Sequence, residues 1–294
     1  MSGGFLVLGG GGFVGRELVN HFGCPGTNTT GNEGFIRCDA TVAEELKSTI
    51  RRLRPRIVIN CVGLADVDRA ETEPDLAYAL NEIVVKNIVS LAHEFRFGLV
   101  QISTDYVFDG SRSNYTENDA TNPINTYGLT KLAGEIAAAS ESGTLIVRIS
   151  TPFGKDRGRG KRQFFRFVID MLREGREVKA VEDQFVTSTY LPDLAKAIDT
   201  LCERNCSGIY HVTGQDRMSR YEFARLVARA AGLDDGHITE ASIRDMHWRA
   251  NRPPDTSLSV SKSLSQGVTY TNTRNAIEEI LTSQPGENAV RHTS

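Results

Sequence analysis

The stretch FLVLGGGGFVGREL, residues 5–18, leads from a short apolar segment through four glycines into the start of an amphipathic helix. Four consecutive glycines are unfavourable for folding, because each loses more conformational freedom than any other residue. Gly9, Gly12 and Gly15 have the spacing G-x-x-G-x-x-G at a strand-to-helix turn. Such a turn lets the backbone approach a pyrophosphate at the positive end of the helix. The stretch therefore predicts a dinucleotide-binding unit of the Rossmann type.

Composition sets the broad class of the protein. The chain has 294 residues, 39% of them hydrophobic and 24% charged, which is enough for one large domain or two interlocked ones. The formal net charge of -3 argues against a nucleic-acid partner. No apolar run is long enough to span a bilayer, and the N-terminus has no secretory pattern. We therefore expect a cytoplasmic protein without a membrane partner.

The five cysteines are odd in number and scattered, which fits thiols in a reducing compartment better than a disulfide framework. Cys202 and Cys206 are four positions apart, as zinc ligands can be. No second Cys or His pair lies near them in the sequence, so no metal site is predicted.

Short apolar runs alternate with helical patterns, as in a doubly wound α/β fold with a parallel sheet. The expected strands are 5–8, 27–30, 35–38, 57–61, 99–103 and 145–149. The expected helices are 42–53, 75–93, 164–174, 191–203 and 219–231. Capping boxes are expected at Thr41 with Glu44 and at Ser219 with Glu222, and the last helix is expected to stop at Gly232.

The regular alternation of expected strands and helices stops after residue 150, which indicates how the chain is divided. Residues 1–150 are interpreted as the dinucleotide-binding domain. Residues 151–282 are interpreted as a smaller C-terminal substrate-binding portion that is interlocked with it. Residues 283–294, with the sequence SQPGENAVRHTS, are expected to form a disordered tail.

The choice of cofactor depends on the second expected strand. An acidic residue about 20 positions after the glycine turn usually holds a ribose 2′-hydroxyl, but this strand ends in Thr27, Asn28, Thr29 and Thr30. These small groups leave room for a 2′-phosphate. We therefore expect NADPH to be modestly preferred over NADH, since no arginine stands at the strand end to make the preference strong.

A second motif, TYGLTK, places Tyr127 and Lys131 one helical turn apart and on one face. A phenol has a pKa of about 10, but a neighbouring ammonium and a nicotinamide cation both favour its anion. Such a tyrosine can deliver a proton to a carbonyl. Upstream, Ser103 and Thr104 end an expected strand at the edge where parallel sheets bind ligands. Either hydroxyl could bond the same carbonyl oxygen, or could only cap a loop.

Seven segments together resemble the extended short-chain dehydrogenases/reductases and, within them, the dTDP-4-dehydrorhamnose reductase family. They are GGGGFVG from residue 9, INCVGLADVDRAETEP from 59, STDYVFDG from 103, NTYGLTKLAGE from 125, VEDQF from 181, YHVTG from 210 and RPPDTSL from 252. The resemblance covers residues 5–258. STDYVFDG and RPPDTSL are its specific parts, because the glycine turn and Y-x-x-x-K belong to the wider superfamily.

The resemblance implies reduction of the 4-keto group of a nucleotide-linked 6-deoxy sugar with NAD(P)H, and it implies roles for individual residues. The catalytic residues would be Thr104, Tyr127 and Lys131. The cofactor-binding residues would be Gly9, Gly12, Phe13, Val14, Gly15, Asp39, Ala40, Cys61, Val62, Gly63, Asn81, Ser103, Tyr127 and Lys131. The substrate-binding residues would be Tyr106, Gln184, Phe185 and Arg252. Within the cofactor set, Asp39 would lie near the adenine and Asn81 on the long helix.

The sequence departs from the family pattern in its second half. Thr151, in STPF, stands where an aromatic residue often packs near the substrate. Residues 162–164 replace an N-N-F segment, and the D-Q-F-G-A-P-T pattern continues here as DQFVTST. These departures leave the identity of the nucleotide base and the sugar open.

Two further features have alternative interpretations. The basic segment with Arg157, Arg159, Lys161 and Arg162 could contact a substrate diphosphate or form a solvated loop. His211, on an expected strand, is interpreted as a packed core histidine rather than as a catalyst.

Other functions remain open besides the reductase. The regulatory subunit of methionine adenosyltransferase also resembles these reductases, so a non-catalytic NADP-binding subunit is one alternative. An NDP-sugar epimerase or dehydratase is another, although those enzymes usually carry a different motif at the catalytic strand end. The expected partner is a small-molecule sugar nucleotide, and a homodimer is one possible assembly.

Overall fold

The structure is a computed structural model, in which residues 4–155 and 163–283 are described. Its central sheet contains five parallel strands in the order β1-β4-β5-β6-β11. They are β1 (Phe5–Leu8), β4 (Ile57–Asn60), β5 (Gly98–Thr104), β6 (Leu145–Ile149) and β11 (Gly208–His211). The short strands β2 (Thr27–Asn28) and β3 (Ile36–Arg37) pair with each other, and a bridge from Gly26 to Val7 joins them to β1. The predicted Rossmann-type sheet is confirmed.

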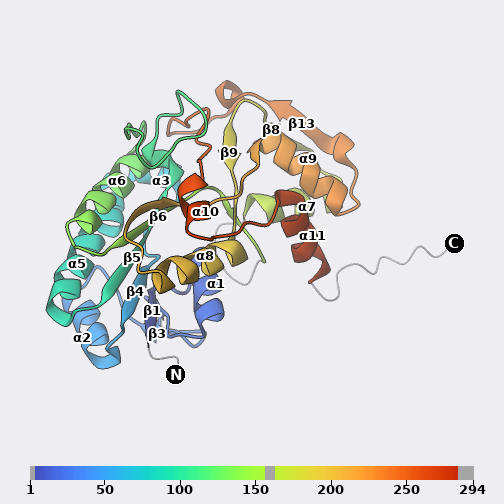
Figure 1. The fold of residues 1–294 in the computed structure, drawn as a ribbon. Helices are drawn as coiled ribbons and strands as arrows, with labels where there is room; N and C mark the ends of the chain where they lie inside the picture. Colours follow the sequence, from blue (N-terminus) through green and yellow to red (C-terminus); the bar gives the residue numbers. More distant parts are fainter. Residues whose placement is uncertain (1–3, 156–162, 284–294) are drawn as a thin grey trace.

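Helices cover both faces of this sheet (Figure 1). One face carries α2 (Ala43–Leu53), α5 (Val84–Phe95) and α6 (Thr126–Ala139), and the other carries α1 (Phe13–Phe22) and α8 (Leu191–Glu203). Side chains alternate between the faces, so Val7 of β1 packs toward α1 and α8, whereas Leu6 and Leu8 pack toward α2 and α5. Both faces are therefore buried, as a doubly wound parallel sheet requires.

A smaller group of elements packs beyond the carboxyl ends of the strands (Figure 1). Its helices are α7 (Phe164–Arg173), α9 (Arg220–Ala230) and α11 (Thr273–Thr282). Its strands are β7 (Pro152–Phe153), β8 (Val178–Val181), β9 (Phe185–Thr187), β10 (Thr189–Tyr190), β12 (Arg217–Ser219) and β13 (Ile238–Ala241). They share a separate apolar core that includes Phe165, Phe223 and Ile277. The second half of the chain also supplies α8, α10 (Ser261–Ser265) and β11, which pack on or complete the main sheet.

The helix expected over residues 75–93 is interrupted. After α3 (Val67–Thr72), the chain forms α4 (Pro74–Tyr78), a π-helical turn at Ala79–Ile83 and then α5. π-Helical turns within helices are frequent at functional sites. This one contains Asn81, whose side chain is buried and fully hydrogen-bonded.

Three local predictions can be compared directly with the structure. The capping box of Ser219 and Glu222 at the start of α9 is confirmed, and the helix ends before Gly232, which has a φ of 66°. The capping box of Thr41 with Glu44 is wrong, because the Thr41 hydroxyl donates to Asp39 and leaves α2 without a side-chain cap. The second strand, expected over residues 27–30, ends two residues earlier, at Asn28.

Asn28 causes this early end of β2. Its side-chain oxygen accepts hydrogen bonds from the backbone N–H groups of Thr30 and Gly31, which turns the chain away from the sheet. The basic segment 157–162 and the tail beyond residue 283 lie outside the described residues. Within the described ranges, no helix is both long and apolar enough to cross a membrane.

Candidate active site

The glycine turn is a tight cradle between β1 and α1. Gly9 has a φ of 73°, in the left-handed region, and a Cβ there would lie 2.9 Å from the Val62 nitrogen. A Cβ on Gly15 would clash with the Gly9 carbonyl and lie 2.9 Å from the Gly10 Cα. Both positions therefore require glycine, as the motif predicts.

The first turn of α1 presents unoccupied donors to this cradle. Gly12 is its N-cap residue and supplies no side-chain acceptor. The backbone N–H groups of Phe13, Val14 and Gly15 lie in this first turn, where intrahelical acceptors are lacking. Together with the helix dipole, such donors favour an anion, so the turn fits a pyrophosphate.

A cleft of about 400 Å³ extends from this turn along the sheet edge. It is lined by Gly9, Gly11, Gly12, Arg16, Asn28, Thr29, Asn32, Glu33, Cys38, Asp39, Ala40, Cys61, Val62, Gly63 and Leu80. Seven of the predicted cofactor residues are therefore brought together in one cleft. Its shape and the uncapped α1 fit a dinucleotide.

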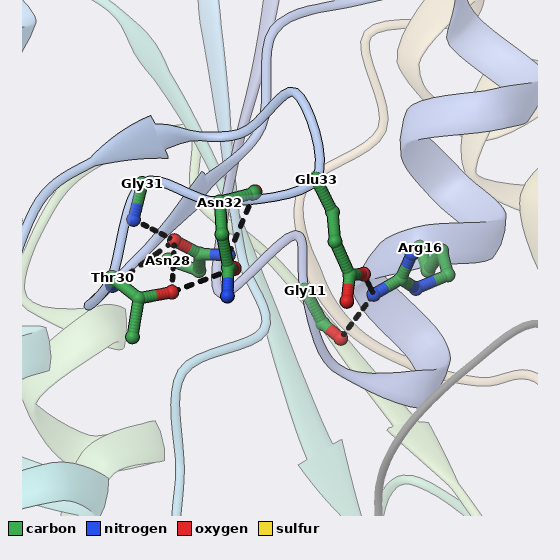
Figure 2. A network of polar contacts seen from close by, with 7 residues as sticks. All are labelled: Gly11, Arg16, Asn28, Thr30, Gly31, Asn32 and Glu33. Carbon is green, nitrogen blue, oxygen red and sulfur yellow. Dashed lines mark hydrogen bonds and ion pairs between the residues drawn. The ribbon is translucent and has the colours of Figure 1, made fainter.

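Sequence reasoning missed two charged residues of this cleft, Arg16 and Glu33. We expected no arginine at the end of the second strand, but Arg16 reaches that position from α1. Its guanidinium lies 2.6 Å from the Glu33 carboxylate (Figure 2). The available signal was the position of Arg16 directly after the last glycine of the motif.

Asn81 fixes the loop that follows β4. Its side-chain oxygen accepts from the Leu64 N–H at 2.9 Å, and its amide donates to Thr130 of α6 at 2.9 Å. A Cβ on Gly63 would lie 2.8 Å from the same Asn81 oxygen. The side chain of Asn81 therefore holds the wall of the cleft against α6.

The predicted catalytic trio of Thr104, Tyr127 and Lys131 lies where β5 and α6 meet. Thr104 ends β5, and Asn125 caps α6 by accepting from the Gly128 N–H at 2.8 Å. Tyr127 and Lys131 follow on consecutive turns, and the Tyr127 ring packs edge-on against Tyr106 at 5.7 Å between centroids. The structure thus brings together Thr104, Tyr106, Tyr127 and Lys131.

The protonation of Tyr127 differs from the sequence-based expectation. Burial raises the pKa of Tyr127 above its usual value, while contact with the Thr104 hydroxyl acts in the opposite direction. The Lys131 ammonium was expected to lower this pKa, but it donates instead to the Ile102 carbonyl at 2.6 Å. The phenol is therefore a proton donor at neutral pH.

Lys131 is itself strongly affected by its surroundings. Burial lowers the pKa of its ammonium to about 8, while the carboxylate of Glu135, one turn further along α6, raises it. Glu135 is held by Arg148, with two contacts of 2.9 and 2.7 Å, and both side chains are buried. This ion pair lies directly behind the trio.

Ser103 does not have the exposed hydroxyl expected for a cofactor contact. It is buried, and its hydroxyl donates to Glu135 at 2.5 Å. Adjacent residues of a strand point to opposite faces, so Ser103 and Thr104 cannot both face the reacting centre. The side chain of Ser103 belongs to the ion pair behind the site.

Asp105 holds the side chain of Thr104, the predicted catalytic threonine. Its carboxylate accepts from the hydroxyls of Thr104 at 3.1 Å and Ser150 at 2.7 Å, and from that of Thr256. Burial raises the pKa of Asp105, and these hydrogen bonds oppose the increase. One carboxyl group therefore joins the ends of β5 and β6 to the RPPDTSL segment.

The four predicted substrate residues lie in three separate contacts. Gln184 lies 3.5 Å from the Tyr106 hydroxyl, beside the trio. Phe185 stacks under the guanidinium of Arg217 at 3.7 Å. Arg252 pairs with Asp68 of α3 at 3.1 Å and donates to its own loop. Arg252 thus fixes the RPPD loop in this structure.

His211 is a core residue, as predicted. It is fully buried, and its ring contacts the Ser259 carbonyl at 3.2 Å. Burial and the adjacent Arg148 lower its pKa to about 3, so the ring stays neutral near pH 7. Among the described residues, no group of His, Cys, Asp or Glu is arranged to hold a metal ion.

Comparisons with known proteins place this site in a family. A family model described as RmlD substrate binding domain matches residues 4–285. A dTDP-4-keto-6-deoxy-D-glucose reductase of Streptomyces niveus is 33% identical over 80% of this chain and 81% of its own. Methionine adenosyltransferase 2 subunit beta of Danio rerio is 29% identical over 94% and 89%. The solved dTDP-4-dehydrorhamnose reductase of Bacillus anthracis, in complex with NADP, has a TM-score of 0.89 at 27% identity, covering 97% and 100%.

These matches run through both halves of the molecule. The family-model match includes the glycine cradle at the start of the chain and the RPPDTSL segment near its end. The family model covers almost all of the described residues. The chain therefore belongs to the RmlD family of extended short-chain dehydrogenases/reductases, the family of the dTDP-4-dehydrorhamnose reductases.

Proposed function

We propose that this protein is an NAD(P)H-dependent oxidoreductase that reduces the 4-keto group of a nucleotide-linked 6-deoxy sugar. One observation carries the proposal. A cleft that fits a dinucleotide and the trio of Thr104, Tyr127 and Lys131 lie at the same carboxyl edge of the sheet. Membership of the RmlD family supports the substrate class.

The roles of the residues follow from their surroundings. When bound, the reduced nicotinamide supplies the hydride. Tyr127 is protonated at neutral pH and gives its proton to the alkoxide that develops at C4. Thr104, held by Asp105, orients the carbonyl beside Tyr127. Lys131 provides positive charge that stabilises the developing negative charge.

The C-terminal portion, residues 151–282, would hold the sugar nucleotide. Tyr106 and Gln184 lie beside the trio and can contact the sugar. Arg252 can bind a phosphate if its pairing with the partly exposed Asp68 is exchanged for the ligand. The homodimer and the cytoplasmic location belong to the proposal and stay predictions.

The proposal is tested by mixing the protein with NADPH and a panel of dTDP-, UDP- and GDP-linked 4-keto-6-deoxy sugars. We expect at least one to oxidise NADPH. Tyr127→Phe should lower kcat by a factor on the order of 10² with near-normal nucleotide affinity, because only the proton donor is lost. Tyr221→Phe, which removes a hydroxyl on α9 outside the site, should stay within about twofold of the parent.

A second function is favoured by a specific observation. The beta subunit of methionine adenosyltransferase 2 from Danio rerio matches 94% of this chain. A regulatory subunit of that kind would bind the nucleotide and a protein partner without turning over a sugar. If no sugar of the panel oxidises NADPH or raises the melting temperature of the NADP-bound protein, the reductase is excluded and this alternative remains.

A further inference from the structure

Arg16 and Glu33 form an ion pair at the rim of the cofactor cleft. Arg16 lies on α1 directly after the glycine turn, and its guanidinium packs over the Phe35 ring at 5.1 Å and lies 3.4 Å from the Gly11 carbonyl. The same guanidinium is 2.6 Å from Glu33 in the loop between β2 and β3 (Figure 2). The Arg16 side chain is 19% exposed and that of Glu33 is 40% exposed, so a ligand can reach both.

The nearby side chains of Asn28 and Asp39 already have hydrogen-bond partners within the protein. The Asn28 oxygen accepts from the Thr30 and Gly31 N–H groups, and its amide donates to the Asn32 side chain at 3.1 Å (Figure 2). Asp39, the third charged residue of the cleft, accepts two hydrogen bonds from Thr41. Asn28 and Asp39 therefore hold the cleft in shape, and its other two charged side chains are those of Arg16 and Glu33.

The position of the pair determines which part of a dinucleotide it would meet. In a βαβ unit the pyrophosphate lies at the first helix and the adenosine ribose at the end of the second strand. Arg16 and Glu33 are at that second location, since both line the cleft beside Asn28 and Thr29. An acidic side chain there can accept a ribose 2′-hydroxyl, and an arginine can bind a 2′-phosphate. This chain has both groups in contact.

We propose that Arg16 recognises the 2′-phosphate of NADPH and that Glu33 is its displaceable counter-ion, so that the pair sets the preference between NADPH and NADH. The inference rests on the proposed function. A partly exposed ion pair contributes little to stability and is easily exchanged. A phosphate offers the guanidinium a dianion with several acceptor oxygens, which is the stronger partner. Glu33 competes with this phosphate, and when Arg16 swings aside it can accept the 2′-hydroxyl of NADH.

The test is calorimetric titration of the whole protein with NADP⁺ and with NAD⁺, which requires no turnover. Arg16→Met keeps an unbranched apolar side chain near Phe35 but removes the charge. We expect it to weaken NADP⁺ binding by about 10- to 100-fold and to change NAD⁺ binding by less than about threefold. Glu33→Gln should tighten NADP⁺ binding by about three- to tenfold and leave NAD⁺ binding equal or weaker.

Arg37→Met is the matched control, because Arg37 is not among the residues that line the cleft and its guanidinium lies 3.7 Å from the Glu45 carboxylate. It should bind both nucleotides like the parent. Equal weakening of both by Arg16→Met, or unchanged NADP⁺ binding in that variant, would overturn the inference and leave the reductase proposal standing. Failure of the unaltered protein to bind either nucleotide would overturn both.

Discussion

At the scale of the residue, the charge of Lys131 is set by two opposing influences. Burial lowers its pKa to about 8, and the Glu135 carboxylate raises it. The ammonium is therefore charged below about pH 8 and neutral above it, so we expect kcat to fall as the pH rises through that value. In Glu135→Gln the pKa of Lys131 is lower still, and the fall should begin at lower pH. Full pH–rate profiles measure both.

A control variant and a contrary outcome separate an effect of the Glu135 charge from an effect on packing. Glu141→Gln changes a carboxylate after the end of α6, outside the ion pair with Arg148, and should leave the profile unchanged. A Glu135→Gln variant that is less stable but keeps the parent's pH profile would show that Glu135 only supports packing.

At the scale of the element, the close approach of α1 to β1 requires that Gly15 has a hydrogen atom in place of a side chain. Gly15→Ala would place a methyl group against the Gly9 carbonyl and the Gly10 Cα. We expect a loss of stability of roughly 1–3 kcal/mol from overpacking and weaker nucleotide binding, because the cradle must widen. Thermal unfolding and titration with NADP⁺ measure the two effects.

Gly12→Ala provides the control for stability. Its Cβ would lie 3.4 Å from the Gly9 carbonyl, which is close to an ordinary contact, so its melting temperature should stay near that of the parent. If Gly15→Ala melts at the parent temperature and binds NADP⁺ normally, the cradle is less rigid than its geometry indicates.

At the scale of the whole molecule, the loop at Arg252 connects the two halves. Arg252 pairs with Asp68 of α3, and Asp68 also accepts from the Arg249 and Ala250 N–H groups. If Arg252 binds the substrate diphosphate, a sugar nucleotide should raise the melting temperature of the NADP-bound protein further. Arg252→Ala should abolish that extra rise while the shift from NADP alone is kept. Loss of both shifts would mean that Arg252 only holds the loop.

Local features of this molecule could be predicted from the sequence, and distant pairings could not. The Gly9–Gly15 turn and the Ser219–Glu222 cap are made by residues close in the chain, so the pattern contains them. Arg16 and Glu33 are 17 positions apart, and only the turn at Asn28 brings them together. The sequence-based prediction of space for a 2′-phosphate therefore did not include Arg16.

The orientation of Ser103 was equally inaccessible to sequence reasoning. A strand such as β5 is buried on both faces, so its sequence does not show which hydroxyl faces the cleft. The raised pKa of Tyr127 also depends on the folded chain, because its largest cause is the burial of the phenol. Motifs in the sequence thus predicted the type of reaction. The hydrogen-bond donors that face the cleft and the protonation of each group could be assigned only from the folded chain.

The place of β11 at the edge of the main sheet has a consequence during synthesis on the ribosome. β6 ends at Ile149, but its neighbour β11 begins only at Gly208. At about 5–20 residues per second, the outer edge of β6 waits several seconds for its partner strand. During that time the nascent chain exposes unpaired backbone groups of β6 and an uncovered apolar face to solvent. The main sheet is therefore complete only after β11, in the second half of the chain, has been synthesised.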